Sequence, residues 1–220
     1  VTHQLRTPLN EIKWNLELVL EKILGKTIKD QEQLMNATYD ANERAIAIVN
    51  DMMMVLDIER QRINLRESET CLDDLVDSLI MEYKKNIKIK KLKIIFANSE
   101  RKQRLSIDPV KIRSAIAKLL DNAIKYTHEE GEIVMRIEEK DGKVIFAISD
   151  NGMGIPVNEQ GNIFNKFYRA TNACLLFPDD SGLGLFIAKT EIEAHGGEIW
   201  FDSQEGAGSN FYFELPIKSE

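Results

Sequence analysis

The sequence predicts two parts: a helical hairpin that dimerises as a four-helix bundle, followed by an α+β domain in which helices cover a mixed sheet. Three features indicate this. Apolar residues near the N-terminus recur at heptad spacing, and the next helix carries two apolar stripes. From about residue 63 helices and strands mix without strict βαβ alternation. We therefore divide the chain into residues 1–66 and residues 67–220.

The first helix is predicted over residues 2–24. Its apolar seam alternates spacings of four and three residues and consists of Leu5, Leu9, Ile12, Leu16, Val19 and Ile23. Residues 25–30 (GKTIKD) form a short connection, and a second helix runs from about residue 31 to the low 60s. Its two adjacent stripes are Leu34, Ala41, Ala45, Ile48, Met52 and Val55, and Ile46, Val49, Met53 and Leu56. Because so broad an apolar face needs more than one partner, we expect a homodimer.

The second part opens with local strand and helix signals. Residues 63–67 (INLRE) alternate like a short strand, and Thr70 with Asp73 resembles a capping box for a helix that continues through the 80s. Further helices are expected over residues 108–127, which begin with an Asp-Pro pair, and from about 183 to 194. The remaining strands are predicted at residues 92–97 and 103–107, in a hairpin over 132–150 that turns at Asp141-Gly142, and in a final pair at 197–203 and 209–216.

Composition and charge exclude several classes of protein. Of the 220 residues, 43% are hydrophobic and 30% are charged, which is typical of a soluble globular chain. A net charge of −7 argues against a nucleic-acid binder, and no apolar run is long enough to predict membrane contact within this segment. The two cysteines, Cys71 and Cys174, suit reduced thiols in a cytoplasmic protein. Because the chain starts at Val1, we expect it to be a piece of a longer protein.

A first cluster of candidate site residues lies in KLLDNAIKY. Asn122, Lys125 and Tyr126 are three and four residues apart, so they share one face of the helix predicted over 108–127. An amide oxygen suits Mg²⁺, an ammonium group suits phosphate, and a tyrosine ring can lie against a base. By itself this set is more typical of a solvated helix face.

A second cluster, DNGMGIP, follows directly after a predicted strand. Gly152 and Gly154 allow backbone conformations and close approaches that side chains forbid, and Asp150 can accept a hydrogen bond from an exocyclic amine such as that of adenine. The alternative is a tight turn that binds no ligand.

A third cluster, SGLGLFIAK, precedes a predicted helix. Gly182, Leu183 and Gly184 place free backbone N–H groups at the first turn, where phosphate can bind. The segment before it, residues 162–181, has the composition of a lid, in which Lys166 and Arg169 are available to phosphate oxygens. An ordinary surface loop remains the alternative for this segment.

In order and spacing, these clusters resemble the N, G1, F and G2 boxes of the histidine kinases of two-component signalling, and HQLRTPL near the N-terminus resembles their H box. The resemblance implies that ATP binds the second domain with Mg²⁺ on Asn122, Lys125 at phosphate, Tyr126 beside adenine and Asp150 on its amino group. Gly152, Gly154, Gly182 and Gly184 would shape the lid hinges and the phosphate-facing backbone. His3 would take the γ-phosphoryl group and pass it to an aspartate of a response-regulator receiver domain.

The residues around the histidine support this interpretation. His3 lies one position outside the heptad seam, Thr7 shares its face, and Pro8 bends the helix just after it. The resemblance assigns Thr7 to a water that dephosphorylates the receiver. Gln4 departs from the acidic residue usual in the family, and it can hydrogen-bond an imidazole N–H but cannot take its proton.

A second departure is Lys118, which stands where the family often has another asparagine near the metal. A cation here would repel Mg²⁺ or contact phosphate, and both possibilities stay open. Alternatives to an active kinase are a phosphatase-biased or weakly active kinase and a nucleotide-binding scaffold. An ATP-driven clamp would leave HQLRTPL without a purpose.

Overall fold

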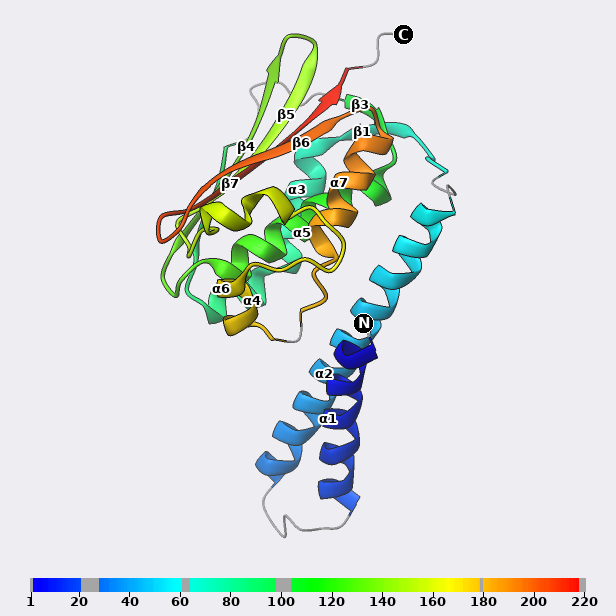
Figure 1. Ribbon diagram of the computed structural model, residues 1–220, viewed down its shortest axis with the longest axis vertical. Coiled ribbons are helices and arrows are strands. Elements are labelled where there is room, and N and C mark those ends of the chain that lie inside the picture. Colours follow the sequence, from blue (N-terminus) through cyan, green and yellow to red (C-terminus); the bar gives the residue numbers. More distant parts are fainter. Residues whose placement is uncertain (1, 21–27, 61–63, 98–103, 179, 218–220) are drawn as a thin grey trace. The chain divides into compact units, whose positions relative to one another are not determined.

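The computed structural model describes residues 2–20, 28–60, 64–97, 104–178 and 180–217. Side chains of residues 2–4, 6, 19, 20 and 28–32 lie outside the description. The chain divides into two compact units, one holding residues 1–61 and 177–181 and the other residues 62–176 and 182–220. Figure 1 shows a helical hairpin and a mixed helix-and-sheet unit, which are described separately below.

The first unit is a hairpin of α1 (Thr2–Leu20) and α2 (Ile28–Glu59), which agrees with the two predicted helices. The predicted ends at residues 21–24, most of the 25–30 connection and residues 61–63 lie outside the described residues. Helix α1 continues through Pro8, and an ion pair of 2.6 Å between Glu11 and Arg44 joins the two helices.

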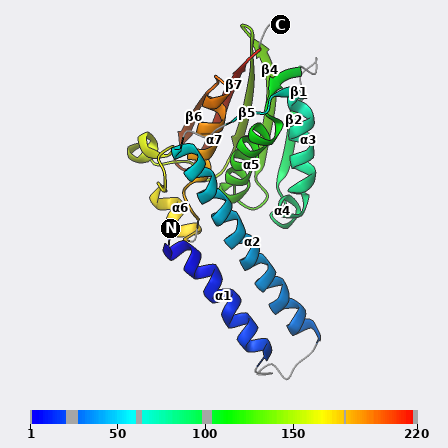
Figure 2. The same ribbon diagram turned by 90° about the vertical axis from the view of Figure 1, so that its right-hand side faces the viewer.

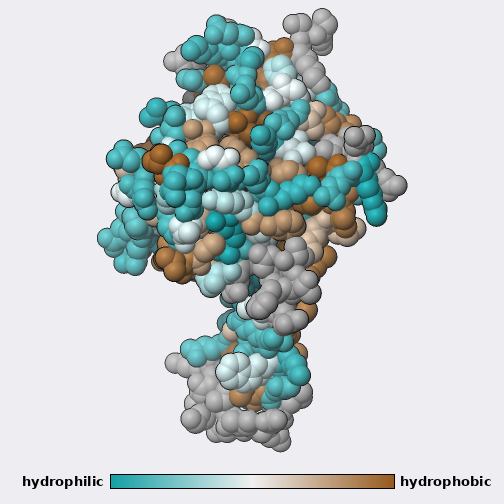
Figure 3. All heavy atoms as spheres, viewed as in Figure 1, coloured by the Kyte–Doolittle hydropathy of each residue, from teal (hydrophilic) through white to brown (hydrophobic). Residues whose placement is uncertain are grey.

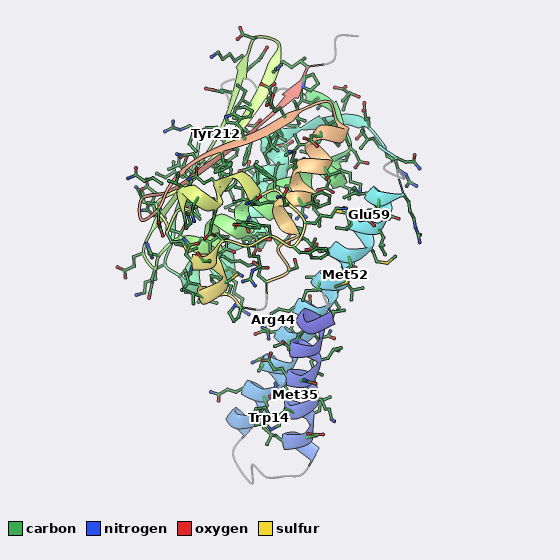
Figure 4. All side chains as sticks on the ribbon, viewed as in Figure 1. Trp14, Met35, Arg44, Met52, Glu59 and Tyr212 are labelled. Atoms are coloured by element: carbon green, nitrogen blue, oxygen red, sulfur yellow. The ribbon has the colours of Figure 1, made fainter. Side chains whose placement is uncertain are left out.

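The two predicted stripes of α2 differ in exposure. Ala41, Ala45 and Ile48 of the first stripe are buried. All four residues of the second stripe are exposed in the single chain: Ile46, Val49, Met53 and Leu56. On the same hairpin, Trp14 and Met35 are also exposed and are labelled in Figure 4.

The second unit contains a five-stranded sheet in the order β2-β4-β5-β7-β6 and a separate two-stranded sheet of β1 and β3. Its strands are β1 (Ser68–Cys71), β2 (Lys93–Ala97), β3 (Arg104–Ile107), β4 (Glu132–Lys140), β5 (Lys143–Asp150), β6 (Glu198–Gln204) and β7 (Gly208–Pro216). Only the β2–β4 pair of the large sheet is parallel, which confirms the mixed sheet. Asp141 and Gly142 both have positive φ and form the predicted turn.

Helices cover one face of this sheet (Figures 1 and 2). The helices of this layer are α3 (Leu72–Glu82), α5 (Pro109–Tyr126) and α7 (Gly184–Ala194), and the unit also contains α4 (Lys84–Ile89), η1 (Val157–Asn162) and α6 (Thr171–Leu176). The core joins the sheet to α3, α5 and α7, and Phe146 stacks on its cross-strand neighbour Phe213 at a centroid distance of 5.0 Å. Much of the surface drawn in Figure 3 is hydrophilic, which fits the charged composition.

Two predictions at the start of this unit are wrong. Residues 64–67 form no strand, and β1 begins only at Ser68, because the Arg66 N–H donates to the Asp108 carboxylate (2.9 Å) and not to a neighbouring strand. Thr70 is not a helix cap either. Its hydroxyl donates to the Ser68 carbonyl, and α3 begins after Cys71 without a side-chain cap.

None of the described helices is long and apolar enough to cross a membrane.

Candidate functional site

The loop that follows β5 is held against the end of α5. The N–H of Met153 donates to the Tyr126 carbonyl (3.1 Å), and the N–H of Gly206 donates to the Met153 carbonyl (2.8 Å). On the far side of the loop, the Ile155 N–H donates to the Ser203 hydroxyl at 2.9 Å. The segment from Asp150 to Ile155 is therefore fixed between α5 and the β6–β7 turn, which brings the first two predicted clusters together.

Both glycines of this loop are required by close contacts. A Cβ at Gly152 would lie 2.3 Å from the Tyr126 carbonyl oxygen, and one at Gly154 would lie 1.9 Å from the Gln204 carbonyl oxygen. Gly154 also has a φ of +63°, a conformation that other residues rarely adopt. The glycines thus let three backbone segments approach one another closely, as the sequence indicated.

Asp150 ends β5 at this junction. Its carboxylate accepts the Gly152 N–H at 2.8 Å. Burial raises the pKa of this carboxyl group, while the N–H groups of Gly152 and Ser209 and the charge of His128 oppose the rise. Its role as an acceptor for adenine stays a prediction.

The Asn122–Tyr126 face lies at the C-terminal end of α5. Asn122, Lys125 and Tyr126 are all partly exposed. The Lys125 ammonium lies 2.7 Å from the Asp121 carboxylate one turn earlier, so a phosphate group that binds Lys125 has to compete with this ion pair.

Lys90, which the sequence analysis did not single out, holds the end of this helix. Its ammonium donates to three carbonyl oxygens, those of Ile124 (2.8 Å), Lys125 (2.7 Å) and Thr127 (2.8 Å). These groups have no partner within a helix, and the positive charge complements the negative end of the helix dipole. Burial lowers the pKa of Lys90. Nothing local marks this lysine among its lysine neighbours, so only packing could identify it.

The predicted lid region, residues 162–181, contains the short helix α6 and follows directly after η1, and the sequence predicted neither element. Glu159 accepts hydrogen bonds from the Thr171 N–H (2.7 Å) and hydroxyl (2.6 Å), which ties the start of α6 to η1. The Asn172 amide donates to the Gly154 carbonyl at 3.0 Å. The lid is therefore connected to the glycine loop.

The two lid cations contact neighbours within the unit. The Lys166 ammonium lies 4.9 Å above the Phe186 ring of α7, and an Arg169 N–H donates to the Ala173 carbonyl at 3.4 Å. The Arg169 side chain also passes Gly182, where a Cβ would lie 2.9 Å from its Cγ. Gly182 has a φ of +67°. Both cations are thus near α7, and their contact with phosphate stays a prediction.

Helix α7 begins beside α5. Leu183, which is buried, is its N-cap residue and forms no side-chain cap, and no acidic residue lies in the first turn. The Leu183 side chain therefore accepts none of the first N–H groups of this helix, which is compatible with a phosphate site. Gly184 starts the helix itself.

At its other end, α7 is tied to the start of α5. His195 is buried, its Nε2 accepts the Asp108 N–H at 3.0 Å, and its Nδ1 lies 2.7 Å from the Glu191 carbonyl. These partners require a neutral ring with hydrogen on Nδ1. His195 therefore links the end of α7 to the start of α5.

The donor atoms near Asn122 limit how a metal could bind. No group of three or more His, Cys, Asp or Glu residues in the described part of the chain could hold a metal ion. A single amide oxygen fits Mg²⁺, because this ion keeps several waters and commonly takes its other ligands from substrate phosphates. The donor set therefore suits a metal that arrives with a nucleotide.

The predicted phosphoacceptor segment lies in the other unit. The backbone of His3 and Gln4 is in the first turn of α1, and their side chains lie outside the described residues. Thr7 is half-buried one turn later. The predicted roles of His3, Gln4 and Thr7 stay predictions.

Two family models match the chain. Residues 1–61 match the His Kinase A (phospho-acceptor) domain, and residues 107–219 match the histidine kinase-, DNA gyrase B-, and HSP90-like ATPase. Sensor histidine kinase WalK of Bacillus subtilis is 31% identical over 223 residues, which cover 100% of this chain and 36% of WalK. The circadian input-output histidine kinase CikA of Synechococcus elongatus is 27% identical, with coverage of 98% and 29%. The chain thus spans about a third of these relatives.

Solved structures show the same fold. Full-length ShkA in complex with AMPPNP has a TM-score of 0.74 at 24% identity, covering 99% of this chain and 45% of ShkA. Histidine kinase ThkA in complex with the response regulator protein TrrA has a TM-score of 0.71 at 24% identity, covering 99% and 60%. With a phospho-acceptor domain followed by this ATPase domain, the chain belongs to the sensor histidine kinases of two-component systems.

Proposed function

We propose that this chain is a kinase core that transfers the γ-phosphoryl group of ATP to His3 and then to an aspartate of a response-regulator receiver domain. The observation that carries the proposal is the junction of α5 with the glycine loop. Met153 and Gly152 meet the Tyr126 backbone there, so the Asn122–Tyr126 face and Asp150 border one site. A phospho-acceptor domain on the same chain supplies the histidine.

The proposed roles follow from side-chain chemistry. Asp150 accepts from the adenine amino group, Tyr126 lies beside the ring, and Lys125 binds phosphate after leaving Asp121. The N–H groups of Gly182–Gly184, with Lys166 and Arg169, bind the remaining phosphate oxygens. Asn122 would hold Mg²⁺, which neutralises charge on the phosphates when it is bound.

In the transfer step, an imidazole nitrogen of His3 forms a bond to the γ-phosphorus as the bond to the β,γ-bridging oxygen breaks, and ADP leaves. Gln4 can orient the ring but cannot accept its proton, so the proton goes to solvent or to a phosphate oxygen. A carboxylate oxygen of the receiver aspartate then attacks the phosphorus, the P–N bond to His3 breaks, and the ring nitrogen takes a proton from solvent, which restores neutral His3.

The partners proposed are a second copy of the chain and a receiver domain. The exposed stripe of α2 (Ile46, Val49, Met53 and Leu56), together with exposed Leu9 and Leu16 of α1, would be covered in a four-helix bundle of two hairpins. The ThkA complex with TrrA supports a receiver as the other partner. A site that uses ATP would place this part of the protein in the cytoplasm.

Incubation with γ-labelled ATP and Mg²⁺ tests the proposal. We expect acid-labile, alkali-stable label on the parent and none on His3→Gln, while both proteins bind AMPPNP equally. Binding without label in the parent would favour the nucleotide-binding scaffold, and no binding would refute the proposal.

Gln4 stands where the family usually has an acidic residue, so the second candidate function is a kinase that phosphorylates His3 slowly. A carboxylate next to His3 would stabilise the imidazolium and take its proton. We therefore expect Gln4→Glu to label faster than the parent, and equal or slower labelling would contradict this role. In the same assay with a labelled receiver, Thr7→Ala should dephosphorylate the receiver more slowly if the chain also acts as a phosphatase.

A further inference from the structure

Helices α3 and α4 form one almost continuous helix. Two hydrogen bonds of the α-helical type bridge their junction: the Tyr83 N–H donates to the Leu79 carbonyl (2.9 Å), and the Ile87 N–H donates to the Tyr83 carbonyl (3.0 Å). Ile80, Tyr83 and Ile87 pack against the core. No residue of α4 is buried, and Figure 2 shows this helix directly after α3. The side of α4 that faces away from the core is therefore open to solvent.

Three lysines and two apolar residues share this open side. They follow one another at spacings of three, one, three and one residues, which places them on the same side of a helix. All five side chains are exposed, and the exposed fractions of the two apolar ones, Met81 and Ile89, are 71% and 68%. We call this set the lysine face, and it consists of Met81, Lys84, Lys85, Lys88 and Ile89.

Positive charge dominates the lysine face. Residues 84–93 contain six lysines and no acidic residue, in a chain whose net charge is −7. Three of the six are engaged elsewhere, since Lys90 caps α5 while Lys91 and Lys93 pair with glutamates. The three whose ammonium groups form no ion pair within the described part of the chain are Lys84, Lys85 and Lys88.

Acidic residues near the lysine face neutralise it only in part. Glu82 and Asp121 each pair with a cation of α5. Asp74 and Asp77 are exposed on α3, one to two helical turns before Met81. The carboxylates of this helical stretch therefore precede the three lysines and do not lie among them.

We propose that the lysine face binds the surface of an anionic lipid bilayer. The three ammonium groups contact anionic headgroups, and Met81 and Ile89 enter the boundary between headgroups and acyl chains. The lysine stems can lie along this boundary while their charged ends stay in water. Binding at the surface needs no apolar run of spanning length, and the lack of such a run was the reason to predict no membrane contact.

The residue types favour lipid over an acidic protein as the occupant. All six cations of residues 84–93 are lysines, and the lysine face contains no aromatic residue. Protein interfaces are enriched in arginine and aromatic residues and depleted of lysine. Lysines beside exposed apolar side chains are instead typical of helices that lie on anionic membranes.

Co-sedimentation of the purified chain with lipid vesicles tests the proposal. Vesicles of about two-thirds phosphatidylcholine and one-third phosphatidylserine should bind the parent at least about tenfold more tightly than vesicles of phosphatidylcholine alone. Salt at about 0.5 M should release most of the bound protein, because it screens the attraction. A triple variant should bind the anionic vesicles about hundredfold more weakly, and its changes are Lys84→Gln, Lys85→Gln and Lys88→Gln.

A second variant tests the apolar part of the lysine face. Ile89→Ser keeps every charge and should weaken binding to the anionic vesicles about fivefold, because less apolar surface enters the bilayer. Undiminished binding of Ile89→Ser would contradict the role of the apolar residues.

The matched control removes three exposed lysines of other elements, with the changes Lys13→Gln, Lys140→Gln and Lys143→Gln. It has the same net charge as the first triple variant and should bind the anionic vesicles within about threefold of the parent. Circular dichroism shows whether each variant is folded, and none of these measurements depends on nucleotide binding.

Two results would overturn the proposal. One is a parent that does not bind the anionic vesicles, and the other is an equally large loss of binding in the two triple variants. If the parent ignores the vesicles but binds polyglutamate, and the first triple variant does not, the lysine face fits an acidic protein and the assignment to lipid is wrong.

Discussion

Replacing Glu191 by leucine should stabilise the second unit at neutral and alkaline pH. The Glu191 side chain is 2% exposed, and neither of its oxygens accepts a well-formed hydrogen bond from a described residue. Burial raises its pKa to about 7, although Ser114, Lys111 and Lys118 of α5 stabilise the charged form in part. A buried carboxylate with incomplete partners costs stability, so an apolar residue of similar size should be favoured.

The size of the effect follows from the pKa. The carboxyl group titrates near 4.5 in the unfolded chain and near 7 in the folded protein. Each pKa unit of difference corresponds to about 1.4 kcal/mol. At a pH above both pKa values, the charged carboxylate therefore lowers the free energy of unfolding by about 3 kcal/mol. Because the folded-state pKa is the higher one, this penalty is absent below the unfolded value, grows as the pH rises, and is complete above about pH 7.

Urea denaturation measures this difference. Trp200 of β6 reports on the second unit if Trp14 of the hairpin is replaced by phenylalanine. We expect Glu191→Leu to gain about 3 kcal/mol at about pH 8 and about 1 kcal/mol less at about pH 6, both above the isoelectric point near 5.2.

Glu193→Leu serves as the control on the same helix, because Glu193 is exposed and its 3.6 Å ion pair with Lys189 lies at the surface. It should change the free energy of unfolding by less than about 0.5 kcal/mol at either pH. A loss of stability in Glu191→Leu, or a gain that does not depend on pH, would refute the reasoning and show that α5 compensates the carboxylate fully.

Two further substitutions test the framework of the site. Lys90→Met should lower the free energy of unfolding by about 2–3 kcal/mol in the same urea assay, because three carbonyl groups at the end of α5 lose their charged donor. Lys91→Met, next to it, should cost less than about 1 kcal/mol because the ion pairs of Lys91 with Glu129 and Glu130 are exposed, and equal effects would contradict the capping role. Gly154→Ala should weaken AMPPNP binding about tenfold or more, because its Cβ would collide with the β6 backbone. Gly142→Ala is the control, because Gly142 also has positive φ but a Cβ there would meet no other atom. Weaker AMPPNP binding in Gly154→Ala with unchanged binding in Gly142→Ala would show that the collision, and not the backbone conformation, weakens binding.

The features that were predictable depend on residues close together in the chain. The Asp141-Gly142 turn, the Asp108 cap of α5 and the glycines of DNGMGIP all express the conformational preferences of their own few residues. The two stripes of α2 follow from helical periodicity in the same way. The strand expected at residues 63–67 failed because Arg66 bonds to a carboxylate 42 positions away, which no local pattern reveals.

By itself, the sequence determined the order of helices and strands in most of the chain and the segments that border the candidate site, since periodicity, turns and caps act over a few residues. Tertiary structure alone decided that Lys90 caps the C-terminal end of α5, that His195 reaches Asp108, and that Lys118 lies against the start of α7. These contacts join residues that are 34 to 87 positions apart. Their partners are set by how the helices pack over the sheet, because packing, not spacing along the chain, brings such distant groups together.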